Sequence, residues 1–271
     1  MTRLRAVFER TRSEGRAAFI PYLTAGDPSP EATVEYAAAL AAGGADVLEL
    51  GVPFSDPLAD GPVIQRATER ALAAGTGTAD VLRCARAVHE RCGIPIVLMS
   101  YANPVLRYGW DRLAEEGARA GVVGTILTDV PPEEADPFRE AGERHGLATV
   151  FLVAPTSPPE RIRRIAERTT GFVYCVSRLG VTGERTSLSD AFVPVLKEVR
   201  KVSDLPVGVG FGISTPDQAR EAGVLADGVI VGSALVAAAE KAGSPQRAAT
   251  ALEAAARDLS AALRDSRKGT Q

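Results

Sequence analysis

The most informative β-α connection in the chain is Asp46-Val47-Leu48-Glu49-Leu50-Gly51-Val52-Pro53-Phe54-Ser55-Asp56-Pro57-Leu58-Ala59-Asp60-Gly61-Pro62. Its first residues predict a buried strand, in which alternation places Val47 and Glu49 on one face and Leu48 and Leu50 on the other. A Pro-rich loop then carries Asp60, and the closing proline suits the first turn of a helix. A carboxylate therefore shares a face with a core residue, either as a structural ion pair or as a catalytic group.

Short apolar runs, often β-branched, alternate with amphipathic stretches rich in Ala, Arg and Glu along the chain. This alternation predicts repeated β-α units around a parallel sheet. We expect eight strands, at 18–23, 47–50, 94–99, 124–127, 148–153, 172–176, 206–210 and 228–231. Eight strands favour a closed (β/α)8 TIM barrel over an open doubly wound sheet.

Additional helices extend this α/β plan. We expect an extra N-terminal helix at 2–14 and two helices, 62–74 and 79–89, in the connection after the second strand. With 271 residues and 45% hydrophobic content, the chain has the size of one α/β barrel domain. We therefore expect a single domain over 1–271, with a flexible polar tail from roughly residue 264.

Composition argues against several classes of function. The sequence has no apolar run of about 18 residues, which a membrane helix needs, and its start lacks the apolar stretch of a secretory signal. We expect a cytoplasmic protein with no membrane partner. A net charge of -3 with scattered arginines does not indicate nucleic-acid binding. Three cysteines without a Cys-x-x-Cys pair predict neither a disulfide framework nor a zinc site.

Two residue types that often serve in catalysis are scarce. The two histidines, His89 and His145, lie far apart in polar helical segments, so we expect solvated side chains and no metal site. The lysines all fall in helical or tail segments away from strand ends, which argues against a Schiff-base enzyme. These lysines are Lys197, Lys201, Lys241 and Lys268.

Segments spread over roughly residues 15 to 240 resemble the tryptophan synthase α subunit family. The agreement is strongest in Glu49–Pro62 and Arg178–Gly183. The other matching segments, taken from the start of the chain to its end, are 19–28, 99–104, 127–131, 153–156, 174–183, 210–214 and 232–233. The resemblance implies the same barrel fold and a lyase of aromatic amino-acid (tryptophan) biosynthesis, which cleaves indole-3-glycerol phosphate to indole and glyceraldehyde 3-phosphate.

The resemblance also implies roles for three residues. Glu49 matches the family's principal acid-base residue, and desolvation would raise its pKa so that it could alternate between acid and base. Asp60 would stay ionised and hold the indole N–H, which stabilises the developing indolium charge. Tyr174, which belongs to the sixth strand, would place its hydroxyl beside the carboxylate, although a core aromatic explains this position equally well.

Glycines after consecutive strands predict the phosphate site. Gly183, Gly212 and Gly232 follow strands six, seven and eight, where backbone N–H groups and a helix N-terminus can bind phosphate. Ser233 could add a hydroxyl donor and cap its helix. Turn geometry alone would also explain each glycine. The resemblance also implies substrate-binding roles for Tyr22 and Thr182. It implies further indole-pocket residues, for which ordinary barrel core is the alternative: Leu23, Met99, Ile126, Leu152 and Phe211.

The resemblance also implies a partner. A β subunit containing pyridoxal phosphate would receive indole and join it to serine in an α2β2 heterotetramer, while this chain itself needs no cofactor. Residues 54–60 and 103–104 would contact that subunit, and a lid at 178–185 would bring Thr182 to the Asp60 region. A stand-alone lyase, a weakly catalytic regulatory partner and another phosphate-binding barrel, such as a sugar-phosphate isomerase or epimerase, remain alternatives.

Overall fold

Parallel strands form a closed barrel in the computed structural model, which describes residues 2–176, 188–210 and 212–266. The strands in these residues are β1 (Ala18–Thr24), β2 (Leu48–Gly51), β3 (Ile96–Ser100), β4 (Val122–Leu127), β5 (Ala148–Val150), β6 (Leu152–Val153), β7 (Val173–Val176), β8 (Val207–Gly210) and β9 (Gly228–Val231). They follow the order β5-β4-β3-β2-β1-β9-β8-β7-β6. Because only Phe151 separates β5 from β6, the two ends of the sheet meet. The predicted barrel is confirmed, with its fifth strand divided into two short segments.

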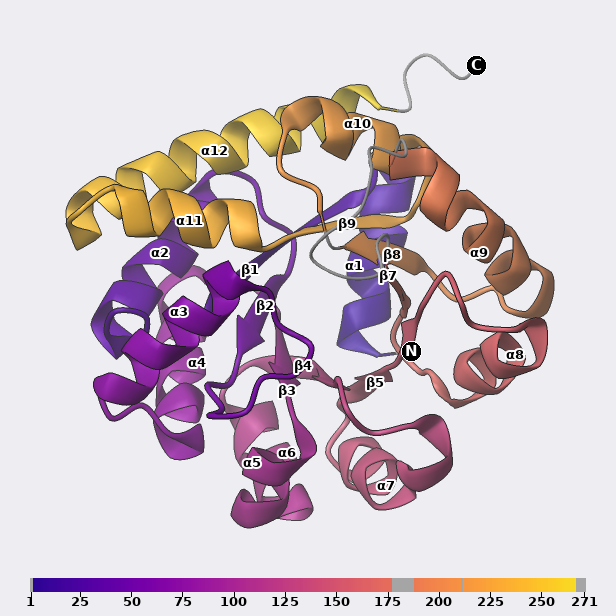
Figure 1. The fold of residues 1–271 in the computed structure, drawn as a ribbon, viewed down its shortest axis with the longest axis horizontal. Coiled ribbons are helices and arrows are strands. Elements are labelled where there is room, and N and C mark those ends of the chain that lie inside the picture. The colour runs from indigo at the N-terminus through magenta and orange to yellow at the C-terminus, as the bar shows by residue number, and fades with distance from the viewer. Residues whose placement is uncertain (1, 177–187, 211, 267–271) are drawn as a thin grey trace.

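Helices surround this barrel, except α1, which lies across one end of it (Figure 1). The helices are α1 (Arg3–Ser13), α2 (Pro30–Ala42), α3 (Pro62–Ala73), α4 (Thr78–Cys92), α5 (Ala102–Tyr108), α6 (Trp110–Arg119), α7 (Asp136–Arg144), α8 (Pro159–Arg168), α9 (Leu188–Val202), α10 (Pro216–Leu225), α11 (Ser233–Lys241) and α12 (Pro245–Asp265), with a 3-10 turn at Pro132–Glu134. The expected N-terminal helix and the two helices after β2 are present. Helix α12 continues into the expected tail as far as Asp265, and residues 267–271 lie outside the described part of the chain.

Helix starts follow from local sequence. The side chains of Thr2, Ser29, Thr215 and Ser244 accept hydrogen bonds from backbone N–H groups at the starts of α1, α2, α10 and α12. A proline occupies the first turn of α2, α3, α8, α10 and α12, where its missing N–H has no helical partner to lose. These local signals mark where the capped helices begin.

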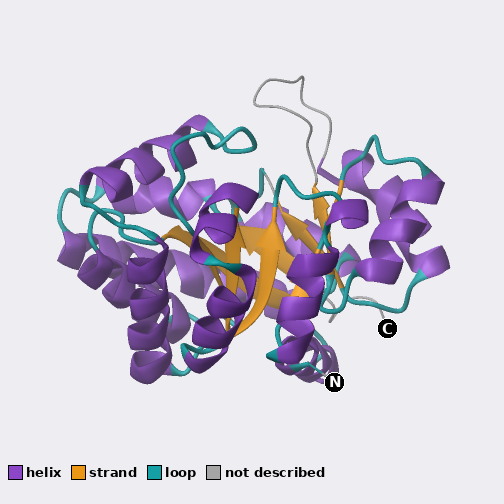
Figure 2. Cartoon of the chain, turned by 90° about the horizontal axis from the view of Figure 1, so that it is seen from below, coloured by secondary structure: helices purple, strands orange, loops and turns teal. Residues whose placement is uncertain are grey.

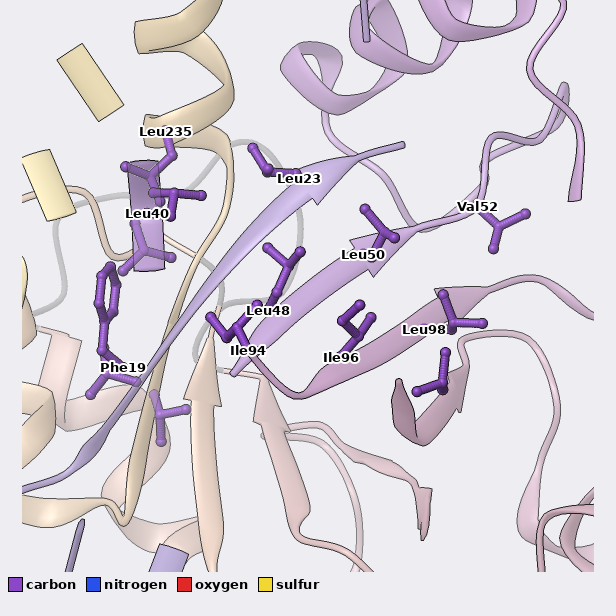
Figure 3. Close-up of a cluster of buried hydrophobic side chains, with 14 of the residues drawn as sticks. Phe19, Leu23, Leu40, Leu48, Leu50, Val52, Ile94, Ile96, Leu98 and Leu235 are labelled. Carbon is purple, nitrogen blue, oxygen red and sulfur yellow. The ribbon is translucent and has the colours of Figure 1, made fainter. Parts of the chain in front are cut away.

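Alternation along the strands produces two apolar layers. Leu48 and Leu50 point outward and pack with residues of the surrounding helices, such as Leu40 (Figure 3). Val47 points into the barrel, on the side of the sheet that also carries Glu49. Leu23 belongs to the outer layer, so the expectation that it lines the pocket is wrong: its strand neighbour Tyr22 points inward, and adjacent strand residues face opposite sides.

Helix α1 closes the amino-terminal end of the barrel, where Figure 2 shows the N-terminus. Leu4 and Phe8 belong to the interior cluster, and the Phe8 ring lies 5.3 Å from that of Phe172. At the same end the buried carboxylate of Asp46 accepts hydrogen bonds from Phe19 N–H at 2.9 Å and from Arg16 at 2.6 Å. Because this end is filled, the opposite end, at the carboxyl termini of the strands, is left for a site.

Candidate active site

Glu49 lies inside the barrel, opposite Tyr22 on β1 and Val97 on β3. Its residue surface is only 2% exposed, and its Oε2 has no hydrogen-bond partner among the described residues. Burial, followed by the charge of Asp60, raises the pKa of Glu49 to about 8. The carboxyl group is therefore mostly protonated at neutral pH and can donate a proton.

Asp60 approaches from the loop that follows β2. Its N–H donates to Pro57 O at 3.1 Å, and helix α3 begins two residues later at Pro62. Burial raises the pKa of Asp60 to about 6, and a hydrogen bond from Tyr101 opposes that rise. Asp60 therefore keeps its charge at neutral pH while Glu49 keeps its proton, so the two carboxyl groups occupy different ionisation states.

Tyr101 supports this loop, a role that was not predicted from the sequence. It stands at the N-cap of α5, just after β3, and its hydroxyl accepts a hydrogen bond from Ala59 N–H at 2.9 Å. Its ring lies 5.4 Å from that of Phe54, at the other end of the same loop. Its position could have indicated this role, because Tyr101 is an aromatic residue at the carboxyl end of a barrel strand. It also lies in 99–104, one of the segments that resemble the family.

Two buried tyrosines flank Glu49. Burial raises the pKa of Tyr22, as do the charges of Asp60 and Glu49, and its hydroxyl lies 3.2 Å from Thr24 Oγ1. Burial also raises the pKa of Tyr174, and Glu49 adds the largest effect of charge. Space for these rings comes from glycine, because a Cβ at Gly51 or Gly210 would overlap the Tyr22 or Tyr174 hydroxyl. The importance of these two strand glycines was missed from the sequence.

The expected pocket residues fall into two groups. Met99 and Ile126 are buried in the same interior cluster as Tyr22 and Tyr174, and half-buried Leu152 packs against that cluster. These three residues are therefore brought together with Glu49 on the inside of the barrel. The other predicted positions, and the lid at 178–185, lie outside the described residues: Thr182, Gly183 and Phe211.

The glycine sites after β8 and β9 occupy loop and helix-cap positions. Gly212 has a φ of +84°, which suits glycine, and it is exposed. Gly232 is the N-cap of α11, and a Cβ there would lie 3.4 Å from Tyr22 Cβ. The expectation that Ser233 caps this helix is wrong, because Gly232 holds the cap position and Ser233 is the first helical residue. The N-terminus of α11 nevertheless lies beside the inward-facing residues of β1.

Metal-ligating groups do not gather in the described part of the chain, where no cluster of three or more His, Cys, Asp or Glu residues could hold an ion. His145 is half-buried at the C-cap of α7. His89 is half-buried against Gly121, and its Nδ1 is enclosed without a hydrogen-bond partner among described residues. Both histidines are thus less solvated than predicted, His89 because its ring packs against Gly121.

Within the described part of the chain, no helix has the length and apolar character needed to cross a bilayer.

Comparison with known proteins gives a consistent result for the sequence. The model of the family described as tryptophan synthase alpha chain matches residues 8–264. A tryptophan synthase alpha chain of Solibacter usitatus is 52% identical over 259 residues, which are 96% of this chain and 97% of that protein. One of Geobacter sulfurreducens is 49% identical over 236 residues, 87% of this chain and 89% of that protein.

Solved structures agree with the sequence comparison. A chain of Mycobacterium tuberculosis tryptophan synthase superposes with a TM-score of 0.89 at 44% identity, covering 97% of this chain and 98% of that one. The tryptophan synthase alpha chain of Legionella pneumophila superposes with a TM-score of 0.89 at 38% identity, covering 100% of both chains. The predicted family is therefore confirmed along most of the chain: this protein belongs to the tryptophan synthase alpha chain family.

Proposed function

We propose that Glu49 carries out the proton transfers of the family reaction in this chain. Tryptophan synthase alpha chains are lyases that cleave indole-3-glycerol phosphate to indole and glyceraldehyde 3-phosphate. One observation carries the proposal: an enclosed carboxyl group with an unpartnered oxygen and a pKa of about 8, beside a second carboxyl group with a pKa of about 6. Such a pair suits acid-base chemistry at neutral pH.

The proposed steps return Glu49 to its starting state. Protonated Glu49 gives its proton to indole C3, and the positive charge passes to the ring nitrogen. Glu49, now a carboxylate, takes the proton from the side-chain hydroxyl next to the ring. The electrons of that O–H bond form the aldehyde, the carbon-carbon bond to C3 breaks, and its electrons neutralise the ring. The indole ring is its own electron sink, so the chemistry needs no lysine.

Asp60 stabilises the charged intermediate in this proposal. An ionised Asp60 accepts a hydrogen bond from the indole N–H, and this interaction strengthens as the ring becomes positive. Tyr101 supports such a role, because its hydroxyl holds the loop at Ala59 and lowers the pKa of Asp60. Tyr174 supplies a hydroxyl on the inner side of the barrel, where the charge of Glu49 already influences it.

The remaining contacts divide between the two ends of the substrate. We place the indole ring among inward-facing apolar residues and the phosphate at the N-terminus of α11, where N–H groups favour an anion. The proposed indole-pocket residues are Tyr22, Met99, Ile126, Leu152 and Phe211. The proposed phosphate residues are Gly183, Gly212, Gly232 and Ser233. Thr182 would close over the site from the 178–185 segment.

Membership in this family implies a β-subunit partner. Pyridoxal phosphate is carried by that β subunit, and the alpha chain needs no cofactor. We propose an α2β2 assembly, located in the cytoplasm, in which indole passes to the β subunit for condensation with serine.

Two exposed apolar side chains on the segments that follow β2 and β3 support β docking. Leu58, in the loop that carries Asp60, is 94% exposed, and Leu106 on α5 is 57% exposed. Tyr101 holds the two segments together through Ala59 and Phe54. Exposed apolar residues that adjoin one another mark interaction sites, so we place the β contact on residues 54–60 and on the start of α5 at 103–104.

The proposed function is tested by indole release from indole-3-glycerol phosphate, measured with the purified chain in the presence and absence of its β subunit. We expect slow release by the chain alone and a steep rise when β is added. Fast release that β leaves unchanged would indicate a stand-alone lyase. Absence of release in both conditions would contradict the catalytic proposal.

A further inference from the structure

Four charged side chains, Asp27, Arg66, Arg70 and Glu240, form a network between three parts of the chain. Arg70 donates to both carboxylate oxygens of Asp27, from Nε at 2.7 Å and from Nη2 at 2.8 Å. Its Nη1 donates to Glu240 Oε1 at 2.7 Å. Arg66 binds the same Glu240 carboxylate with two hydrogen bonds, at 3.1 and 2.9 Å. Arg70 thus joins two carboxylates that are far apart in sequence.

Each member of the network lies on a segment that leads to the proposed site. Arg70 belongs to α3, which begins two residues after Asp60. Glu240 belongs to the last turn of α11, whose first residue is Ser233. Asp27 lies in the loop that follows β1, the strand that carries Tyr22. The network therefore connects the loop after β1 with the helices that follow β2 and β9.

Helices α3 and α11 also contact one another beside β1. Ala67 of α3 and Val236 of α11 belong to the same apolar cluster as Tyr22, and Figure 1 shows both helices beside β1. Apolar packing alone lets neighbouring helices slide to some extent, because it has little directionality. The charged network adds directional hydrogen bonds near the C-terminal ends of both helices, where Arg70 and Glu240 lie.

The geometry of Arg70 distinguishes it from an ordinary surface ion pair. Exposed pairs usually contribute little, whereas a two-pronged arginine-carboxylate contact is directional and strong. The side chain of Arg70 is 33% exposed, and that of Asp27 is 11% exposed. Only an arginine can use one flat guanidinium group to bind Asp27 with two nitrogens and Glu240 with the third.

We propose that Arg70 is a positioning residue that holds the helix after Asp60 in register with the helix that starts at Gly232-Ser233. This inference rests on the proposed function, in which Asp60, just before the first helix, binds the indole end of the substrate and the N-terminus of the second helix binds the phosphate end. Loss of Arg70 changes the placement of the two subsites relative to one another. A substrate that spans both subsites responds to that change, whereas a fragment that occupies one subsite does not.

The test compares the whole substrate with its two fragments, using the chain in complex with its β subunit. The variants are Arg70→Gln, Arg70→Lys and Glu240→Gln. Arg91→Gln is the matched control, because Arg91 makes an exposed ion pair between α4 and α2 with Glu35. The measurements are kcat and KM for indole-3-glycerol phosphate, the inhibition constants of indole and glyceraldehyde 3-phosphate, and the thermal unfolding midpoint of each variant.

We expect Arg70→Gln to lower kcat/KM by about tenfold, with a smaller loss in Arg70→Lys and Glu240→Gln, because each keeps part of the network. Both inhibition constants should stay within about twofold of wild type, as should all constants of Arg91→Gln. If Arg70→Gln does not fold, Glu240→Gln, which changes a group on the surface of α11, still decides the question.

Two results would overturn the positioning role. One is unchanged kcat/KM in folded Arg70→Gln and Glu240→Gln. The other is a parallel loss of affinity for either fragment, which would show that one subsite itself was damaged. A wild-type complex that fails to cleave the substrate would instead contradict the proposed function, so the two failures are separable.

Discussion

The hydroxyl of Tyr101 accepts a hydrogen bond from Ala59 N–H at 2.9 Å, and this bond ties the loop that carries Asp60 to the end of β3. The same hydroxyl lowers the pKa of Asp60, which burial would otherwise raise further. One residue therefore sets both the position and the charge of the second carboxylate. Its influence leads to the first prediction.

Tyr101→Phe should reduce kcat/KM at pH 7 by about fivefold, because the loop loses one hydrogen bond and Asp60 loses a group that favours its ionised form. The acidic limb of the pH profile should move to higher pH. Steady-state indole release between pH 5 and 9 would check this. Tyr108→Phe is the matched control, since Tyr108 donates to Glu116 away from this loop. A Tyr101→Phe profile that overlays the wild type would contradict the role of Tyr101.

Activity should follow a bell-shaped pH profile. Asp60 must be ionised, which requires a pH above about 6, and Glu49 must start protonated, which requires a pH below about 8. We expect kcat/KM to be highest between these values, with the two limbs reporting the coupled pair as a whole. A rate that keeps rising above pH 9 would show that a protonated carboxyl group is not needed.

Glu49 should lower stability at neutral and alkaline pH. Its pKa is about 8 in the folded chain and near the ordinary 4.5 when unfolded, so the unfolded state binds fewer protons between these values. Stability therefore falls as pH rises from about 4.5 to 8. Glu49→Gln removes this effect and should stabilise the chain by on the order of 4 kcal/mol at pH 8, and by much less at pH 4.5. Urea unfolding at both pH values measures the difference; an equal change at both would rule out ionisation as its cause.

Asp46 should be essential for the closed end of the barrel. Asp46→Ala leaves the Phe19 N–H and the Arg16 guanidinium without their buried acceptor, and we expect a loss of about 3 kcal/mol of unfolding free energy. Asp217→Ala is the control, because Asp217 pairs with Arg220 at an exposed position and should change stability by less than about 0.5 kcal/mol. Similar losses in the two variants would contradict the importance of burial.

The local sequence predicted the features that depend on one strand or one helix. Alternation placed Leu48 and Leu50 outside and Glu49 inside, as the structure shows. The same rule would have corrected Leu23, because Leu23 and Tyr22 are neighbours in one strand and cannot both face inward. The family resemblance located the region of the pocket. The alternation of side chains along each strand decides which residues point into it.

Features that depend on contacts across the fold could not be predicted in this way. Tyr101 acts on Ala59, which is 42 positions away in sequence, and Arg70 acts on Glu240, which is 170 positions away. No local pattern marks such partners, since they meet only when the barrel closes. The space that Gly51 makes for Tyr22 is likewise visible only between paired strands.

The measurement that tests the central claim most directly is single-turnover indole release by the complex with β, comparing Glu49→Gln with wild type. Glu35→Gln, an exposed change on α2, serves as control. Loss of the ionisable group should lower the rate of the chemical step by about 10²-fold or more, with substrate affinity largely kept. A near-normal rate in folded Glu49→Gln would contradict the assignment of Glu49 as the group that transfers protons.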